Sequence, residues 1–202
     1  MYEHKRAKPD NPIEEWPASR FSPYAFADRD VSDDDLRSLF EAARWAPSSY
    51  NEQPWSYIVA KRTSREEFQR LLSCLVQGNQ PWAKAAPVLA LGCVSQKFAR
   101  NGKPNAAAEH DLGTASACLT VEATARGLFV HQMIGILPDR ARELYGIPDG
   151  VRPLTGLAIG YLGDPSTLPE KYKERDLAPR QRKGMAEFVF GGRWGAPSDL
   201  VK

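Results

Sequence analysis

A long helical pattern runs from Ala106 to Arg126, and it places strong limits on the fold because most of its side chains are small. One apolar stripe recurs at helical spacing and predicts a buried face: Leu112, Ala115, Leu119 and Ala123. Small residues on and beside this stripe would let another backbone approach closely: Gly113, Ala115, Ser116 and Ala117. Gly127 follows as the expected left-handed residue at the helix end. We therefore expect close packing around this helix.

Strand and helix patterns alternate along the rest of the chain. Ser32 is the predicted N-cap of a helix that starts with acidic residues and ends near Pro47, and its apolar face is Leu36, Leu39, Phe40 and Ala43. The segment 86–94 is almost entirely apolar, which predicts a strand buried on both faces. Further strands are expected at 56–62, 128–133 and 155–163, and further helices at 65–76 and 138–146. Residues 1–17 are expected to form a loosely packed lead-in, and residues 18–202 a single domain that includes a C-terminal arm.

The composition argues against several classes of function. A chain of 202 residues that is 42% hydrophobic can bury the core of one domain, and its net charge of +2 is far below the basic excess typical of nucleic-acid binding. No apolar run is long enough to cross a bilayer, and the N-terminus lacks the apolar core of a secretory signal. We expect no nucleic acid or membrane partner, and a cytoplasmic location.

The sequence gives no positive sign of a metal, nucleotide-loop or nucleophile site. It contains no glycine-rich dinucleotide fingerprint between a strand and a helix and no P-loop. The histidines His4, His110 and His131 lie in separate segments, without the spacing that pairs two metal ligands on one helix. The cysteines are widely spaced in apolar segments and are expected to be reduced core residues: Cys74, Cys93 and Cys118. A Cys118 nucleophile with a remote histidine is the alternative, but its alanine-rich surroundings favour packing.

Three polar elements remain, and together they favour the binding of a phosphate and a polar ring. The loop that follows the first long helix concentrates hydrogen-bonding side chains between two prolines, in the sequence "WAPSSYNEQPW". Arg20 and Ser22 offer a guanidinium and a hydroxyl, and Arg180 and Arg182 offer a second cationic pair. Each arginine taken singly is typical of a solvated surface, whereas their combination with the loop indicates a binding site.

The chain resembles the FMN-dependent nitroreductase family from Arg20 to Phe190. Four stretches carry the resemblance in this order: "RFSPYAF", "AARWAPSSYNEQPW", "DLGTASACLTVEATARGLFVHQMIGI" and "LAIGYLGDP". The resemblance implies an α+β sandwich with a mostly antiparallel central sheet flanked by helices. It also implies a homodimer, in which the helix from Ala106 to Arg126 lies at the centre and the C-terminal run through Phe190 adds a strand to the partner's sheet.

The same resemblance assigns cofactor-binding residues. Arg20 and Ser22 match the family's first flavin element, and Tyr24 stands where the family has a second arginine. The implied loop contacts come from the second chain, and the remaining contacts come from the end of a strand and from the basic pair near the C-terminus. The implied set is Arg20, Ser22, Tyr24, Pro47, Ser48, Ser49, Asn51, Gln53, Gln132, Met133, Ile134, Gly135, Arg180 and Arg182. The backbone of Ile134 or Gly135 would face flavin N5.

The implied reaction is hydride transfer from NADH or NADPH to the flavin, followed by transfer to a small organic acceptor such as a nitroaromatic or a quinone. Donor and acceptor would take turns over one ring without a catalytic side chain. Phe98, Arg100 and Asn105 would form a wall of the substrate pocket, and the alternative for their segment is a mobile surface loop. Related activities stay open, namely dehydrogenation, dehalogenation, flavin breakdown and FMN binding without turnover, as does a non-flavin interaction domain.

Overall fold

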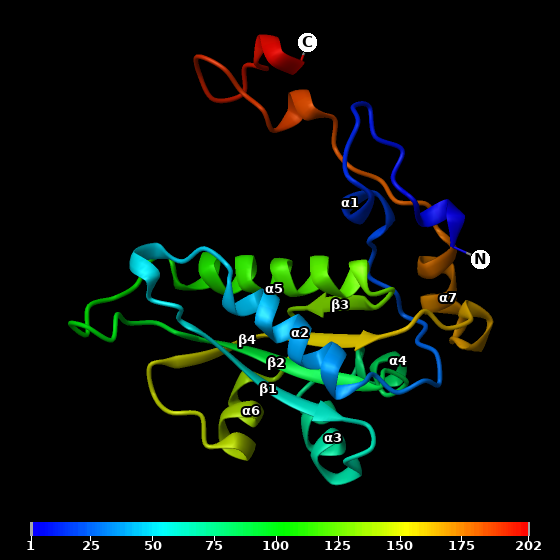
Figure 1. Ribbon diagram of the computed structural model, residues 1–202, viewed down its shortest axis with the longest axis vertical. Coiled ribbons are helices and arrows are strands. Elements are labelled where there is room, and N and C mark those ends of the chain that lie inside the picture. The colour runs from blue at the N-terminus through cyan, green and yellow to red at the C-terminus, as the bar shows by residue number, and fades with distance from the viewer. Residues whose placement is uncertain (1, 202) are drawn as a thin grey trace.

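A computed structural model describes residues 2–201, with a four-stranded sheet at its centre (Figure 1). The strands, in the order in which they lie across the sheet, are β1 (Trp55–Lys61), β2 (Val88–Ser95), β4 (Val151–Gly160) and β3 (Phe129–Met133). Every neighbouring pair is antiparallel, so β1 and β3 are the two edges. The predicted α+β class with an antiparallel central sheet is confirmed.

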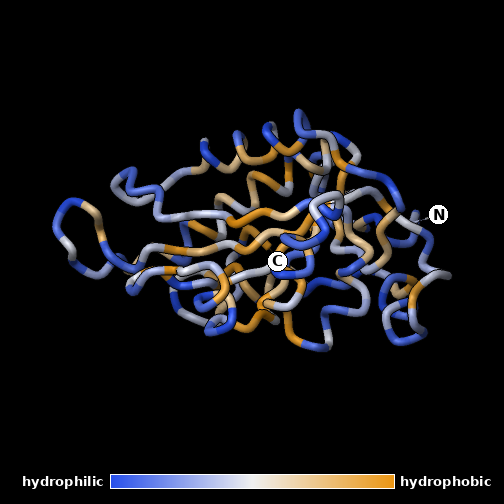
Figure 2. Tube along the Cα trace, turned by 90° about the horizontal axis from the view of Figure 1, so that it is seen from below, coloured by the Kyte–Doolittle hydropathy of each residue, from blue (hydrophilic) through white to orange (hydrophobic). Residues whose placement is uncertain are grey.

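Helices cover both faces of the sheet. On one face lie α2 (Asp33–Arg44) and α5 (Ala108–Ala125), and on the other lie α3 (Arg65–Leu72), α4 (Gln80–Ala83) and α6 (Pro138–Tyr145). The central strand β2 shows both layers, because Val88 and Ala90 pack toward α2 and α5 while Leu89 and Leu91 pack on the other side. All four side chains are fully buried, which confirms the strand predicted to be buried on both faces. Figure 2 shows the apolar residues gathered on these strands.

The long helix α5 forms as the sequence pattern predicts. Its apolar stripe is at most 1% exposed and faces the sheet: Leu112, Ala115, Leu119 and Ala123. The helix ends at Ala125, and Gly127 follows the cap residue Arg126 with a φ of 71°. The Leu128 N–H donates to the Ala123 carbonyl at 2.8 Å and the Gly127 N–H donates to the Thr124 carbonyl at 3.0 Å, so the last carbonyls are satisfied.

Several boundaries differ from the predicted ones. β4 begins at Val151 rather than at residue 155, because a register shift opposite Gly92 and Cys93 accommodates Pro153 within the strand. α3 ends at Leu72, and Leu75 instead forms an isolated bridge with Ile136. α2 ends at Arg44, before Pro47. The helix α7 (Glu170–Leu177) was not predicted, because only two of its side chains are buried.

The predicted loose lead-in is wrong for its first residues. Lys5 is 7% exposed, and its ammonium donates to the Arg175 carbonyl at 2.6 Å. The Tyr2 hydroxyl donates to the Gly163 carbonyl at 2.9 Å. The start of the chain, including the short helix η1 (Glu3–Lys5), therefore packs on α7 and on the residues that follow β4. Only residues 8–14, which connect η1 to α1 (Glu15–Ser19), form an exposed stretch.

The C-terminal arm leaves the body after α7 and ends far from the sheet (Figure 1). It contains the short helical turns η4 (Met185–Glu187) and η5 (Asp199–Val201), and the rings of Phe190 and Trp194 lie 5.2 Å apart. A third short turn, η3 (Pro165–Thr167), precedes α7.

Two of the three cysteines lie in the core. Cys74 and Cys93 are buried, and burial raises the pKa of the Cys93 thiol to about 11. Cys118 is only partly buried, and it packs against the core cluster formed by α2, α5 and the sheet. Cys118 therefore lies at the margin of the core, while Cys74 and Cys93 lie within it.

Among residues 2–201 no helix combines the length and the apolar character needed to span a membrane. Within the same residues no three histidine, cysteine, aspartate or glutamate side chains gather as a metal site would require.

His131 on β3 gives the fold a testable pH dependence. Its Nδ1 lies 2.8 Å from the Pro23 carbonyl, its ring packs 4.4 Å from the Trp82 ring, and burial lowers its pKa. Between the lowered pKa of His131 in the folded protein and the pKa of about 6.5 in the unfolded chain, the unfolded chain binds more protons than the folded one. The contribution of the neutral His131 to the free energy of unfolding is therefore complete above this pH range and is lost as the pH falls through it. We expect the free energy of unfolding to fall between about pH 7 and pH 5 more steeply in the wild type than in His131→Asn, which does not titrate there. Urea unfolding at both pH values measures this, and equal slopes in the two proteins would contradict it.

Candidate functional site

Three arginines from opposite ends of the chain come together near α1 and α7. Burial lowers the pKa of Arg20, and the positive charge of Arg182 lowers it further. The pKa of Arg180 is lowered by burial and by the charges of Arg20 and Arg182. Within residues 2–201 no carboxylate is recorded as an ion-pair partner of these three side chains. A guanidinium cluster without an internal counter-charge is typical of a site for a phosphate or another anion.

Arg180 has a structural part in this cluster. Its guanidinium donates to the carbonyls of Ala18 at 2.8 Å, Lys5 at 3.2 Å and Pro17 at 3.2 Å, which joins the C-terminal arm to α1. Its Nε is buried without a hydrogen-bond partner among the described residues. Arg182 is exposed, and among residues 2–201 its guanidinium donates only to the carbonyl of Gln181, at 2.7 Å. Arg20 and Arg182 are therefore the members of the cluster with free hydrogen-bonding capacity.

A buried carboxylate from α7 holds the segment that carries Arg20 and Ser22. Asp176 is 1% exposed and accepts hydrogen bonds from the backbone N–H groups of Tyr24 at 3.0 Å and Ala25 at 2.9 Å. Burial raises the pKa of this carboxyl, while these two hydrogen bonds act to lower it. Arg20 Nη1 lies 3.5 Å from the Ser22 hydroxyl, so the two predicted groups do lie together. Sequence analysis did not identify Asp176.

Tyr24 is packed into an aromatic group. Its ring lies 5.0 Å from the ring of Trp82 and 4.7 Å from that of His131, and its hydroxyl accepts a hydrogen bond from Arg175 at 3.1 Å. The hydrogen bond from His131 to the Pro23 carbonyl joins the same segment to edge strand β3. The cofactor contact implied for Tyr24 stays a prediction.

Strand β3 lies beside that segment, because Phe129 packs on Phe21 and His131 contacts the Pro23 carbonyl. The Gln132 amide donates to Thr120 Oγ1 at 3.0 Å and to the Ser116 carbonyl at 3.2 Å, so this predicted residue joins β3 to α5. Met133 is in the core, whereas Ile134 is 79% exposed.

The turn after β3 leaves little space for a side chain at Gly135. The Gly135 carbonyl accepts hydrogen bonds from the Val76 N–H at 3.1 Å and from the Asn79 side chain at 3.0 Å. A Cβ atom at position 135 would lie 2.5 Å from Asn79 Nδ2. The backbone of Ile134 and Gly135 is therefore set in one conformation at the exposed edge of the sheet.

The polar loop between α2 and β1 is strained. Three residues other than glycine have left-handed backbones, with φ of 56° at Tyr50, 54° at Asn51 and 52° at Gln53. Each such residue costs about 1–2 kcal/mol. Strain of this kind persists only where surrounding contacts enforce it, and it is concentrated at functional sites.

The contacts that enforce this conformation come from Asp111 on α5. Its Oδ2 accepts hydrogen bonds from the Ser48 hydroxyl at 2.8 Å and from the Ser49 N–H at 3.0 Å. Ser48 Oγ in turn accepts from the Gln53 N–H at 2.8 Å, and the Gln53 side chain donates to the Asn51 carbonyl at 3.1 Å. Asp111 was missed, although its spacing with Ala108, Leu112 and Ala115 places it on the buried face of the helix. The predicted Pro47 is exposed at the start of this loop.

The predicted substrate wall is divided by the structure. Phe98 and Arg100 pack on Tyr50, with 5.8 Å between the two rings and 4.4 Å from the guanidinium to the Tyr50 ring. The Ala99 N–H donates to Glu52 at 2.5 Å, so this segment is joined to the strained loop. Asn105 is different, because it is 6% exposed and its Oδ1 accepts from the Ala107 N–H at the start of α5. The substrate contact implied for Asn105 stays a prediction.

The two parts of the candidate site lie at opposite ends of α5 (Figure 1). The loop is held by Asp111 in the first turn, while Phe21, next to Arg20, packs 5.3 Å from Phe129, which follows the helix end. A helix of 18 residues is about 27 Å long, so one chain does not bring these parts together.

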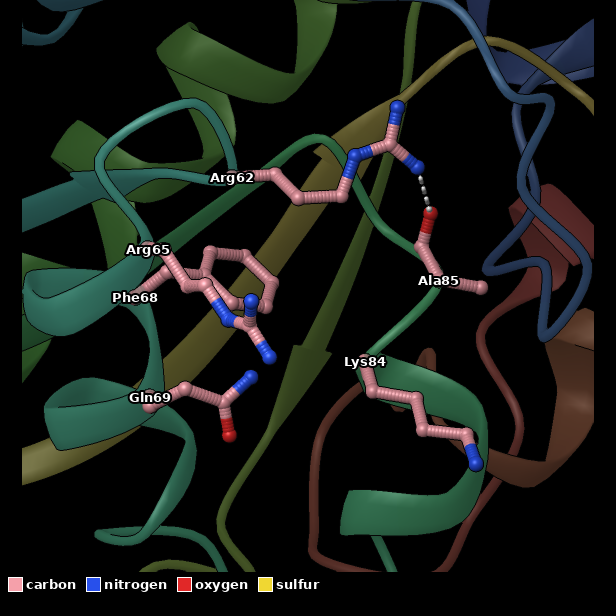
Figure 3. A pocket seen from close by; sticks show the side chains of 6 residues that line it. All are labelled: Arg62, Arg65, Phe68, Gln69, Lys84 and Ala85. Atoms are coloured by element: carbon pink, nitrogen blue, oxygen red, sulfur yellow. Dashed lines mark hydrogen bonds between the residues drawn. The ribbon is translucent and has the colours of Figure 1, made fainter.

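A separate shallow pocket lies between α3 and α4 (Figure 3) and contains no residue of the predicted site. Its lining is Arg62, Arg65, Phe68, Gln69, Lys84 and Ala85. Arg62 is already paired with Asp28 at 2.6 Å and donates to the Ala85 carbonyl at 3.5 Å. Phe68 is 2% exposed, so its ring offers almost no surface to a ligand. We assign the chemistry to the arginine cluster and the strained loop instead.

Comparisons with known proteins identify the family of this chain. Residues 18–161 match the nitroreductase family. An uncharacterised 15.4 kDa protein of Mycolicibacterium smegmatis is 41% identical over 148 residues, which cover 70% of this chain and 98% of that protein. The FMN reductase (NAD(P)H) of Bacillus subtilis is 29% identical over 159 residues, which cover 70% of this chain and 62% of that protein. A crystal structure of an oxidoreductase containing FMN shares 34% identity at a TM-score of 0.90, and the match covers 97% of this chain and 100% of that one. The chain therefore belongs to the nitroreductase family.

Proposed function

We propose that this protein is an FMN-dependent oxidoreductase that takes hydride from NADH or NADPH and reduces a small organic acceptor such as a nitroaromatic or a quinone. The observation that carries the proposal is the arginine cluster without a counter-charge, on a segment that packs beside strand β3. The names of two relatives support it, an FMN reductase and an oxidoreductase containing FMN. When bound, FMN would supply the reversible acceptance of a hydride.

Different residues of the chain would bind different parts of such a cofactor. Arg20 and Arg182 have the charge and the free donors to bind its phosphate, and Ser22 offers a hydroxyl beside Arg20. The fixed backbone at Ile134 and Gly135 would lie along the ring. Ser48, Ser49 and Asn51, on the strained loop, would contact the ring from a second chain, because they lie at the far end of α5 from Arg20.

The described residues offer little acid–base chemistry near the cluster. His131 uses Nδ1 in its contact with the Pro23 carbonyl, and burial lowers its pKa, which keeps the ring neutral near pH 7. His110 is exposed on α5, and Cys118 is partly buried and packs against the core beside α2. We infer that these side chains bind, orient and exclude water, and that hydride transfer itself needs none of them as a proton donor.

A homodimer is part of the proposal, and two surfaces support it. Residues 112–121 of α5 contain no charged side chain, although Gly113 and Ala117 are exposed on the outward side of the helix. Large apolar side chains are also exposed along the C-terminal arm, with 60% exposure at Phe188, 92% at Trp194 and 85% at Leu200. A second copy of the chain would cover both surfaces and bring a strained loop to each arginine cluster.

The first test of the function is the reductive half-reaction. Protein saturated with FMN should hold about one flavin per chain and lose its yellow colour when anaerobic NADH or NADPH is added without an acceptor. A quinone or nitroaromatic should then restore the colour, and initial rates should give parallel double-reciprocal lines, because donor and acceptor occupy one site in turn.

The half-reaction should survive in His110→Ala, His131→Asn and Cys118→Ala wherever FMN stays bound. Bound flavin that no reduced nicotinamide reduces would make the protein a passive carrier or a relative with another reaction. Failure of the wild type to bind FMN at all would contradict the function.

The second test concerns the phosphate. Arg20→Ala or Arg182→Ala should weaken FMN binding by roughly 2–4 kcal/mol, about 30-fold or more, because each change removes a charge-assisted hydrogen bond to an anion. Flavin fluorescence titration measures this. Riboflavin, which lacks the phosphate, should bind these variants and the wild type equally. The matched control is Arg37→Ala, an exposed arginine paired with Asp34 on α2. If both site variants bind FMN like the control, these arginines are ordinary surface residues.

The third test concerns association. Ala117→Arg places a long charged side chain at the middle of the outward side of α5, so sedimentation should show a monomer with FMN affinity reduced about tenfold or more, since each ring then lacks the second chain's loop. Gln69→Arg on α3 is the control, because it adds the same charge at an exposed helical position on the other side of the sheet. A dimer of wild-type strength in Ala117→Arg would exclude this side of α5 as the interface.

A further inference from the structure

We propose that Asp111 is a positioning residue that sets the loop of residues 48–53 within a single chain, before a cofactor or a second chain is present. This inference rests on the proposed function, because the loop matters only if it contacts the flavin. It adds a residue that neither the motif pattern nor the comparisons assign.

The environment of Asp111 shows why its hydrogen bonds are strong constraints. The side chain is 1% exposed, and no cation within residues 2–201 is recorded as its ion-pair partner. A buried carboxylate is costly unless hydrogen-bond donors satisfy it. Two donors come from the loop, the Ser48 hydroxyl at 2.8 Å and the Ser49 N–H at 3.0 Å. The carboxylate and the loop therefore stabilise each other.

Ser48 transmits this constraint across the whole loop. Its Oγ donates to Asp111 and accepts from the Gln53 N–H, so the two ends of the loop are fixed to one atom. The residues between those ends include Tyr50 and Asn51, whose left-handed backbones would relax if the ends were released. The loop conformation is therefore imposed from α5, a rigid element of the core.

The constraint also extends to the predicted substrate segment. Glu52 of the loop accepts a hydrogen bond from the Ala99 N–H, and Arg100 lies over the rings of Tyr50 and Phe98. If the loop were released from Asp111, its contacts with residues 98–100 would shift as well. Asp111 thus orients both the cofactor loop and the segment packed on it.

A general helix-dipole role for Asp111 would predict a different result. Asp111 lies in the first turn of α5, where negative charge is favourable, but Glu109 is in the same turn. A dipole role would change only the stability of the helix. A positioning role changes the protection of specific loop amides and the affinity for the flavin ring.

The experiment uses Asp111→Ala, Asp111→Asn and a control, Ser116→Ala. Ser116 is 1% exposed on the same helix, and its hydroxyl pairs with the Tyr57 hydroxyl at 2.9 Å rather than with the loop. Hydrogen exchange is measured on FMN-free full-length protein well below the unfolding temperature. In Asp111→Ala the amides of Ser49 and Gln53 should exchange about tenfold faster or more, because both lose their acceptor network. Asp111→Asn should be intermediate, and Ser116→Ala should match the wild type.

Flavin titration supplies the second readout. Asp111→Ala should weaken FMN and riboflavin by the same factor, about 10- to 100-fold, because the loop contacts the ring. Arg182→Ala should weaken FMN alone. If Asp111→Ala does not fold, Asp111→Asn carries the test, since it keeps the side-chain volume.

Two results separate this inference from the proposed function. Wild-type exchange at Ser49 and Gln53 in the Asp111 variants would overturn the positioning role, whether or not FMN binds. Faster exchange with unchanged riboflavin affinity would also overturn it, because the loop would then be set by Asp111 without serving the ring. If the wild type binds no flavin while the Asp111 variants exchange faster at Ser49 and Gln53, the result contradicts the proposed function alone.

Discussion

Like charges repel, and the arrangement of both chain ends around Arg20, Arg180 and Arg182 must overcome that repulsion. Arg180 is held by three backbone carbonyls of the N-terminal segment. Asp176 fixes the backbone that follows Arg20. Lys5 packs on the Arg175 carbonyl, which keeps the chain start against α7. The N-terminal segment and α7 thus form the frame of an anion site, and a bound phosphate would relieve the remaining repulsion.

The second half of the site depends on a balance between strain and hydrogen bonding. Three left-handed residues in the loop cost about 3–6 kcal/mol in total, at about 1–2 kcal/mol each. Two hydrogen bonds to the Asp111 carboxylate contribute about 3–6 kcal/mol, at about 1.5–3 kcal/mol each. The terms are of equal size, which explains how a loop of ordinary residues can hold a conformation that usually needs glycine. The two prolines that bound the loop limit its alternatives further.

Elements with a strong local pattern could be predicted from the sequence, and elements defined by distant partners could not. The stripe of α5, the buried strand β2 and the Ser32 cap depend on neighbours in the chain, and all three formed as expected. The start of β4 was missed because Pro153 is tolerated only where β2 shifts register. α7 was missed because its pattern is mostly polar. The combination of Arg20, Arg182 and the polar loop indicated a binding site from the sequence, but the flavin contacts of these candidate residues came from the family resemblance, because a single arginine or serine does not differ by type from a surface residue. Asp111 and Asp176 were not predicted, because the hydrogen-bond donors of these buried carboxylates lie 62 and 152 residues away in the sequence.

The separation of the two halves has a thermodynamic consequence for the proposed dimer. If a cofactor contacts Arg20 and Arg182 of one chain and the Ser48–Gln53 loop of the other, each molecule of cofactor adds contacts between the chains. Binding of the cofactor and association of the chains are then linked, and each strengthens the other by the same factor. A loop already set by Asp111 reduces the conformational entropy lost at that step, so more of the interaction free energy appears as affinity. A rigid loop on a rigid helix is therefore the arrangement expected where one chain must complete the binding site of another.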